Sequence, residues 1–168
     1  MPCGLSRKIW PFDVSEPKIL LTSSPVTLLS VIATGDSNVN AGQDIFGGSS
    51  TFGSGAGNVH SFDAGRYIDF TNFGNPSRFN GSTYFNGTIV DVTATGDLIL
   101  AAGNASIFMS LVTDGSISQD KSQGYLNVSG NMILEAAGNI TLDDPGNVLV
   151  GNIASSATNI TLLNTSQF

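Results

Sequence analysis

The sequence is poor in the residue types that carry most catalytic and metal chemistry. It has one cysteine and one histidine in 168 residues, so it can form neither an intrachain disulfide nor a zinc site built from several such ligands. The histidine, His60, lies in a segment rich in glycine, serine and phenylalanine, where a packed or surface role is far commoner than a catalytic one. No G-x-S-x-G motif accompanies it. The sequence therefore predicts no enzyme, no cofactor and no metal ion.

Charged residues are also scarce. They make up 11% of the chain, against roughly 25% in an ordinary soluble domain. The net charge is −7, and residues 19–168 contain only three cationic side chains. An acidic body of this kind cannot neutralise a phosphate backbone, nor does it attract an anionic membrane surface. The sequence thus predicts no nucleic-acid binding and no membrane insertion.

Long apolar runs and helical periodicity are missing as well. The most apolar stretch, residues 19–33, is too short and too polar to span a membrane, and the acids and prolines around it argue against a secretory signal. The only helix-like patch, LEAAG at 134–138, contains a glycine and has β-branched neighbours. We therefore expect an all-β protein.

What the chain does contain is a short repeat. A glycine, usually followed by asparagine or aspartate, precedes alternating apolar residues, as in GDLIL at Gly96, GNMIL at Gly130 and GNITL at Gly138. The copies recur roughly every 8 residues, which fits one strand and a tight turn. Three strands per coil give a coil of roughly 23 residues, which is typical of a β-helix or β-solenoid.

The repeat also leads to an expectation about assembly. Residues 95–168 make about three such coils, and a free-standing stack of three coils would expose two open ends around a small core. We therefore expect three chains to intertwine in a homotrimer. The apolar residues expected in the core between chains are Leu98, Leu100, Ile133 and Leu142.

The chain divides into three parts. Residues 1–18 are rich in proline and predict an extended docking arm, on which Trp10 and Phe12 either bind a neighbouring protein or fold back onto their own body. Residues 19–78 predict a β-rich domain with a Gly/Ser-rich loop. Residues 79–168 predict a β-helical stalk, which begins with two successive FNG turns.

Acidic side chains are the remaining candidates for catalysis, because many β-helices cleave polysaccharides with two carboxyl groups. Asp143 and Asp144 precede Pro-Gly, and a tight turn explains them better than catalysis does. Asp36 and Asp97 recur in a T-G-D phrase, where we expect a local Asx-turn hydrogen bond. The other candidate carboxylates are Asp114, Asp120 and Glu135.

Asparagine, serine and threonine are abundant, and they form seven N-x-S/T motifs, as many as chance provides in such a composition. A flat face that binds ice or polysaccharide would need a regular T-x-T pattern, whereas the threonines here are scattered. The motifs begin at Asn80, Asn86, Asn104, Asn127, Asn139, Asn159 and Asn164.

Two resemblances give functional expectations. GDLILAAGN (96–104) and GNMILEAAGNITL (130–142) resemble the repeats of filamentous-haemagglutinin-like bacterial adhesins. This resemblance implies a right-handed parallel β-helix in a secreted, cell-surface adhesin or an extracellular filament subunit.

The second resemblance covers SRFNGSTYFNGTIVDVTATGDLIL (77–100), which is similar to the trimeric β-helical segments of bacteriophage tail fibres and spikes. It implies a non-enzymatic structural protein of the virion that assembles as a homotrimer. Residues 1–18 would dock it to neighbouring virion proteins, and a host glycan is the candidate ligand. We take the virion protein as the leading expectation and the secreted adhesin as the alternative.

Overall fold

The structure is a computed structural model that describes residues 13–14, 18–22, 24–29, 31–71 and 75–165. Trp10 and Phe12 lie outside these residues, so their expected role on a docking arm stays a prediction. Among the described residues no helix is long and apolar enough to cross a membrane.

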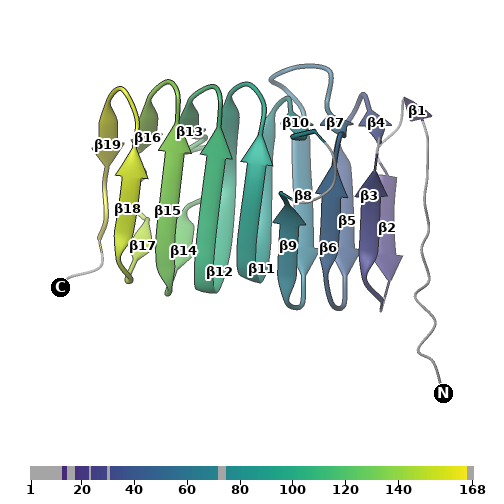
Figure 1. The fold of residues 1–168 in the computed structure, drawn as a ribbon, viewed down its shortest axis with the longest axis horizontal. Coiled ribbons are helices and arrows are strands. Elements are labelled where there is room, and N and C mark those ends of the chain that lie inside the picture. The colour runs from purple at the N-terminus through teal and green to yellow at the C-terminus, as the bar shows by residue number, and fades with distance from the viewer. Residues whose placement is uncertain (1–12, 15–17, 23, 30, 72–74, 166–168) are drawn as a thin grey trace.

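The described chain is all β and winds into a parallel β-solenoid of about six turns (Figure 1). This confirms the all-β, β-solenoid fold predicted from the glycine-led repeat. The strand pairings among the described residues are parallel, because each coil brings the chain back to the same edge and lays the next strand beside the last.

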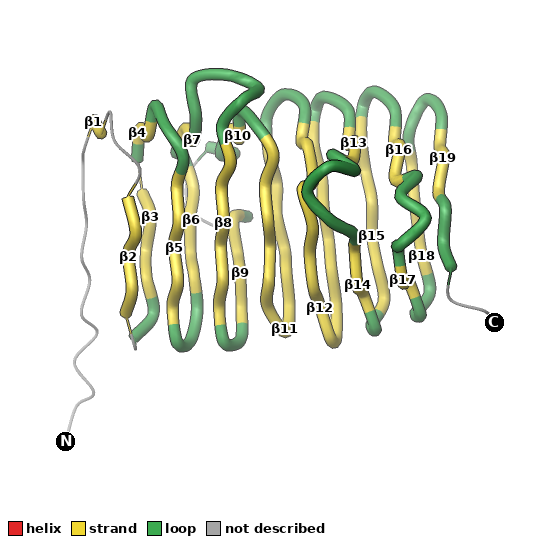
Figure 2. Tube along the Cα trace, turned by 180° about the vertical axis from the view of Figure 1, so that it is seen from behind, coloured by secondary structure: helices red, strands yellow, loops and turns green. Residues whose placement is uncertain are grey.

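The coils present two long faces, visible as two layers in Figures 1 and 2. Strands β11 (Ser82–Ala94) and β12 (Leu98–Thr113) bend at a corner and so contribute to both faces. The first face further contains β2 (Lys18–Thr22), β5 (Ser37–Ala41), β8 (Val59–Ala64), β13 (Ile117–Gln119), β14 (Leu126–Val128), β16 (Ile140–Leu142), β17 (Val148–Leu149) and β19 (Ile160–Leu162). The second further contains β3 (Val26–Leu29), β6 (Ile45–Gly48), β9 (Tyr67–Phe70), β15 (Asn131–Ala136) and β18 (Ile153–Ser156).

A third, shorter face closes the coils near the N-terminal end of the solenoid. It is a four-stranded parallel sheet, in the order β1 (Asp13–Val14), β4 (Ile32–Ala33), β7 (Thr51–Phe52) and β10 (Arg78–Phe79). In the later coils a tight turn takes its place, as at residues 95–97 between β11 and β12.

The coil length agrees with the spacing of the repeat. Leu98 pairs with Ile117, Ile117 with Ile140, and Ile140 with Ile160, which are steps of 19, 23 and 20 residues. Loops at 120–125 and 143–147 interrupt the first face and absorb the difference in length. The parallel ladder also continues from the earlier coils into the later ones, because β8 pairs with β11.

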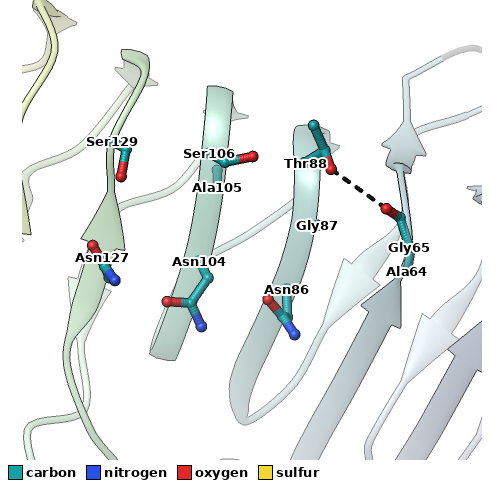
Figure 3. A pocket seen from close by; sticks show the side chains of 10 residues that line it. All are labelled: Ala64, Gly65, Asn86, Gly87, Thr88, Asn104, Ala105, Ser106, Asn127 and Ser129. Carbon is teal, nitrogen blue, oxygen red and sulfur yellow. Dashed lines mark hydrogen bonds between the residues drawn. The ribbon is translucent and has the colours of Figure 1, made fainter.

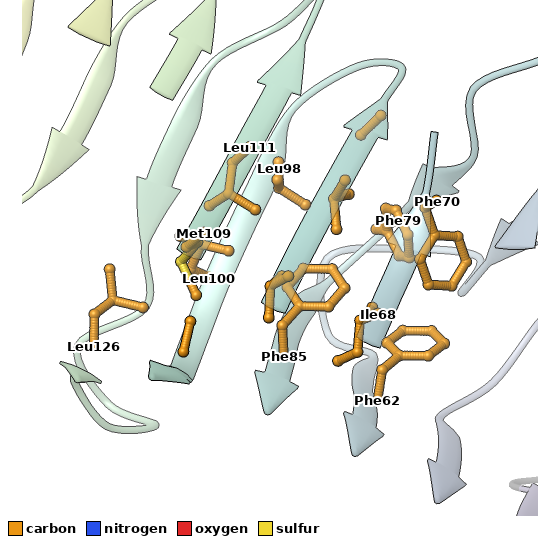
Figure 4. Packing of buried hydrophobic residues seen from close by; sticks show 14 of the residues in the cluster. Phe62, Ile68, Phe70, Phe79, Phe85, Leu98, Leu100, Met109, Leu111 and Leu126 are labelled. Carbon is orange, nitrogen blue, oxygen red and sulfur yellow. The ribbon is translucent and has the colours of Figure 1, made fainter. Parts of the chain in front are cut away.

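The core lies inside the coils of a single chain (Figure 4). Phenylalanines fill its middle and stack in register: the Phe52 and Phe79 rings lie 5.4 Å apart, and the Phe62 and Phe85 rings 5.7 Å apart. Phe70 contacts Phe62 edge to face at 5.2 Å. Leucine, isoleucine and methionine fill the C-terminal half. This graded core is continuous, as close packing requires.

The two T-G-D aspartates join coils rather than close local turns. The backbone N–H of Val59 donates to Asp36 Oδ1 at 2.9 Å, and that of Ser116 donates to Asp97 Oδ1, also at 2.9 Å. Each donor lies in the next coil. The hydrogen bonds found here therefore differ from the expected Asx turns, because a solenoid places the next coil's N–H directly beside the turn. The accepted backbone hydrogen bond lowers the pKa of Asp36.

Candidate functional site

The residues expected in the assembly core occupy two different positions. Leu98, Leu100 and Leu142 are buried inside the coil of one chain. Ile133 is half-buried and faces outward, whereas its neighbours Met132 and Leu134 are buried. The expectation that Ile133 faces inward was wrong: in GNMIL, as in GDLIL and GNITL, the third and fifth residues point inward, and Ile133 is the fourth. Whether these residues contribute to contacts between chains stays a prediction.

Ile133 belongs to a surface that we call the apolar outer face. It consists of the outward side chains Tyr67, Ile89, Phe108, Val112 and Ile133 on β9, β11, β12 and β15. Ile89 pairs with both Tyr67 and Phe108, so these three form one row across successive coils. Tyr67 is 43% exposed and the other four are half-buried. The second face thus has apolar side chains on its outer side as well as in the core.

The carboxylates considered as catalytic candidates have structural partners instead. Asp143 forms an ion pair with Lys121 at 2.6 Å, and Asp144 accepts a hydrogen bond from the Gly146 backbone N–H at 2.7 Å. This second bond is the turn interaction expected from the D-D-P-G sequence.

Asp114 and Asp120 are likewise held by hydrogen bonds. Asp114 accepts from the Gly96 N–H and the Thr95 hydroxyl, and Asp120 accepts from the Ser122 and Ser82 hydroxyls. These bonds lower the pKa of both carboxyl groups, so both are ionised near neutral pH. The remaining candidate, Glu135, is exposed on the outer side of β15.

One carboxylate pair was missed by the sequence analysis. Asp69 and Asp91 are register partners on the outer side of β9 and β11, so their Cα atoms lie about one strand spacing, roughly 4.8 Å, apart. Burial raises the pKa of Asp91, the charge of Asp69 raises it further, and a hydrogen bond with Ser110 opposes the rise. The two residues are 22 positions apart, so knowledge of the number of residues per coil would have placed them side by side. Among the described residues no group of three His, Cys, Asp or Glu side chains could hold a metal ion.

His60 lies in a row of buried polar side chains in the core. It is 0% exposed and pairs in register with Ser37 on one side and Thr83 on the other. Its Nε2 lies 3.1 Å from the Asn80 carbonyl oxygen. The Ser37 Oγ, His60 Nδ1 and Thr83 Oγ1 atoms have no hydrogen-bond partner among the described residues. His60 is thus a packed residue, as the sequence predicts, and desolvation lowers its pKa.

A hollow on the outer surface lies where β8, β11, β12 and β14 reach the corner between the two long faces (Figure 3). We call it the polar groove; its volume is about 310 Å³. It is lined by Ala64, Gly65, Asn86, Gly87, Thr88, Asn104, Ala105, Ser106, Asn127 and Ser129. No lining residue is charged.

Two parallel rows of side chains run through the groove, as Figure 3 shows. Asn86, Asn104 and Asn127 are register partners in three successive coils and form an amide row. Two residues further along each chain segment stand Thr88, Ser106 and Ser129, which form a hydroxyl row. Each coil thus contributes one amide and one hydroxyl through an N-x-S/T motif.

Most of these groups have no hydrogen-bond partner in the part of the chain that the structure describes. Asn86 donates to Asp63 at 3.2 Å, and Thr88 donates to the Gly65 carbonyl oxygen at 3.4 Å. The side chains of Asn104, Asn127, Ser106 and Ser129 form no hydrogen bond with any described residue. The groove therefore presents free donors and acceptors to whatever fills it.

The backbone explains why this surface is hollow. A register shift between Gly87 and Ile89 marks a bulge where β11 turns the corner. Glycine at position 65 is required there, because a Cβ atom would lie 2.4 Å from the Gly42 carbonyl oxygen. The sequence motifs alone did not identify the groove, because the steps from Asn86 to Asn104 and on to Asn127 are unequal.

Comparison with known families supports a repeat protein. A family model described as "Repeats of unknown function (DUF5649)" matches residues 86–156, which include the amide row and most of the glycine-led repeats. No curated protein and no solved structure matches the chain. The match and the fold together support a β-helical repeat protein.

Proposed function

We propose that this chain is a non-enzymatic structural protein of a virus particle, a fibre, spike or decoration protein that acts through assembly and attachment. The observation that carries the proposal is the apolar outer face on a charge-poor β-solenoid. Its contiguous part is the row of Tyr67, Ile89 and Phe108 across successive coils, and contiguous apolar side chains on an outer surface mark contacts with other molecules. Asp143 and Asp144, two of the carboxylates considered for catalysis, are engaged in an ion pair and a turn hydrogen bond, which agrees with a structural role.

Assembly in this proposal takes place between finished solenoids. The core is already closed within one chain, so copies pack side by side through the apolar outer face and need not exchange strands. The proposed assembly is a homotrimer. In a closed ring of three copies, the apolar outer face of each copy is covered by a neighbouring copy. Residues 1–18, with Trp10 and Phe12, are the proposed contact with neighbouring virion proteins.

A secreted adhesin or extracellular filament subunit is the second candidate. The observation that favours it is the single-chain core. A solenoid whose core is closed within one chain can work as one module of a surface protein. Mass spectrometry of the native N-terminus separates the two. Retention of Met1 disfavours secretion through a cleaved signal, whereas cleavage near residue 33 favours the adhesin.

Sedimentation velocity on Ile133→Asp tests the assembly surface. Because Ile133 faces outward, the variant should fold but lose assembly, and its mass should fall from three chains to one. Thr141→Asp is the matched control, because Thr141 is also half-buried and faces outward but lies on β16 of the first face. If Ile133→Asp assembles as the parent chain does, the apolar outer face is not the contact between copies.

A further inference from the structure

We propose that the polar groove binds a neutral, hydroxyl-rich polysaccharide that lies along the solenoid axis. This inference rests on the attachment role in the proposed function, and it assigns that role a site and a ligand class. It starts from the unpaired amide and hydroxyl rows of β11, β12 and β14.

The rows match a polysaccharide in hydrogen-bonding chemistry. An asparagine amide and a serine hydroxyl each both donate and accept, as sugar hydroxyls do. Parallel strands repeat these groups about every 4.8 Å along the axis, so a polymer with a comparable repeat can meet one amide and one hydroxyl per coil. A ligand with isolated polar atoms would use only part of this array.

The absence of charged side chains in the groove favours a neutral polymer. Its lining contains no cation that could bind phosphate, sulfate or carboxylate. The nearest carboxylate in the amide row is Asp63, which already accepts a hydrogen bond from Asn86. The chain also carries a net charge of −7, which repels anionic polymers.

Two tyrosines extend the same surface. Tyr84 precedes Asn86 by two residues and Tyr125 precedes Asn127 by two, so each ring lies on the outer side next to the amide row. The Tyr84 hydroxyl donates to the Gln123 side-chain oxygen at 2.9 Å, which holds its ring in place. Tyr125 is 54% exposed.

Another pair of asparagines in adjacent coils forms a hydrogen bond within the protein and so has a structural role. At the other end of the first face, Asn159 donates to Asn139 at 2.9 Å, so the two amides satisfy each other across adjacent coils. Asn104 and Asn127 are also adjacent, but no such bond joins them. Their amides are left for a ligand outside the chain.

The test is a titration of the full-length chain, followed through the side-chain amide NMR signals of asparagine. The probes are linear hexasaccharides of glucose, mannose and N-acetylglucosamine, with a hyaluronan hexasaccharide as the acidic comparison. We expect at least one neutral probe to shift the Asn104 and Asn127 signals. The double variant Asn104→Ala/Asn127→Ala should weaken its binding about tenfold or more, since two hydrogen-bonding groups are lost.

Asn159→Ala is the matched control and should bind as the parent chain does. Unchanged melting of the double variant separates lost contacts from lost folding. The proposal is overturned if no neutral probe shifts the two signals, or if only the acidic probe does. Because native mass is measured separately, a chain that assembles but binds no neutral probe refutes the groove assignment alone, and a chain that binds but stays monomeric refutes the trimer alone.

Discussion

Ile133 and Leu134 are neighbours in β15 with opposite surroundings. Leu134 is buried in the core in register with Leu111, whereas Ile133 faces outward in register with Ser110. A shift of one residue would exchange the two sets of side chains, so this relationship fixes the register of the whole second face.

Aspartate substitutions at Leu98 and Ile133 should therefore have different consequences. Leu98→Asp places an unpaired carboxylate in a fully buried position and should cost more than about 4 kcal/mol, enough to unfold the chain. In the single chain outside any assembly, Ile133→Asp should change the free energy of unfolding by less than about 1 kcal/mol, because the new carboxylate remains hydrated. Circular dichroism during thermal melting distinguishes them. Equal losses of stability would mean that the assigned register is incorrect.

Thr83→Val should stabilise the protein or leave its stability unchanged. The Thr83 hydroxyl is buried without a hydrogen-bond partner among the described residues, and valine fills similar space without a polar group to desolvate. Urea unfolding gives the comparison, with Thr93→Val, on the outer side of β11, as the control. A loss of more than about 1 kcal/mol at Thr83 would show that its hydroxyl has a partner, such as buried water.

Stability should decrease as the pH falls below the ordinary histidine value. Burial holds the pKa of His60 below 6.5, and the Asn80 carbonyl and the charge of Asp36 only partly oppose this. The unfolded chain therefore binds the extra proton first. The stability that neutral His60 contributes is complete above pH 6.5 and is lost as the pH falls toward the folded-state pKa, by up to about 1.4 kcal/mol per pH unit.

His60→Leu should flatten this dependence, measured as the melting temperature between about pH 7.5 and about pH 5. The lowered carboxyl pKa values of Asp36, Asp114 and Asp120 act below 3.8, outside this window. An equally steep decrease in His60→Leu would assign the effect to another group.

Asp91→Asn should raise the melting temperature at neutral pH. Folding raises the pKa of Asp91 above 3.8, so the folded state favours its protonated form, and that stabilisation is lost as the pH rises through the raised value. Asparagine removes the charge beside Asp69 and keeps an oxygen that can accept from Ser110. The difference from the parent chain should vanish at about pH 3, below both pKa values. A destabilised variant at neutral pH would mean that the Asp91 charge has a favourable partner.

The repeat predicted much of the C-terminal half of the fold. Glycine-led phrases with alternating apolar residues predicted strands, coil length and the inward positions of Leu98, Leu100 and Leu142. The first coils were harder to predict, because stacked phenylalanines such as Phe62 and Phe85 take the place of the repeated phrase. Ile133 was misplaced because every residue of MIL is apolar, so composition could not decide which alternate set faces inward.

The polar groove could not be predicted from local sequence. Its N-x-S/T motifs are common by chance, and only the unequal coil steps bring three of them into register. The same holds for Asp36 and Asp97, whose partners lie in the next coil and not in the local turn. Pairing between residues far apart in the chain is thus the feature that the sequence alone predicts least well.

The most direct test of the proposed assembly is the native mass of the intact chain by light scattering. We expect three times the mass of one chain, with the apolar outer faces covered in a closed trimer. A mass of one chain would contradict that assembly and favour the single-chain adhesin module. Open-ended polymers would also contradict it, because they require a contact that does not close.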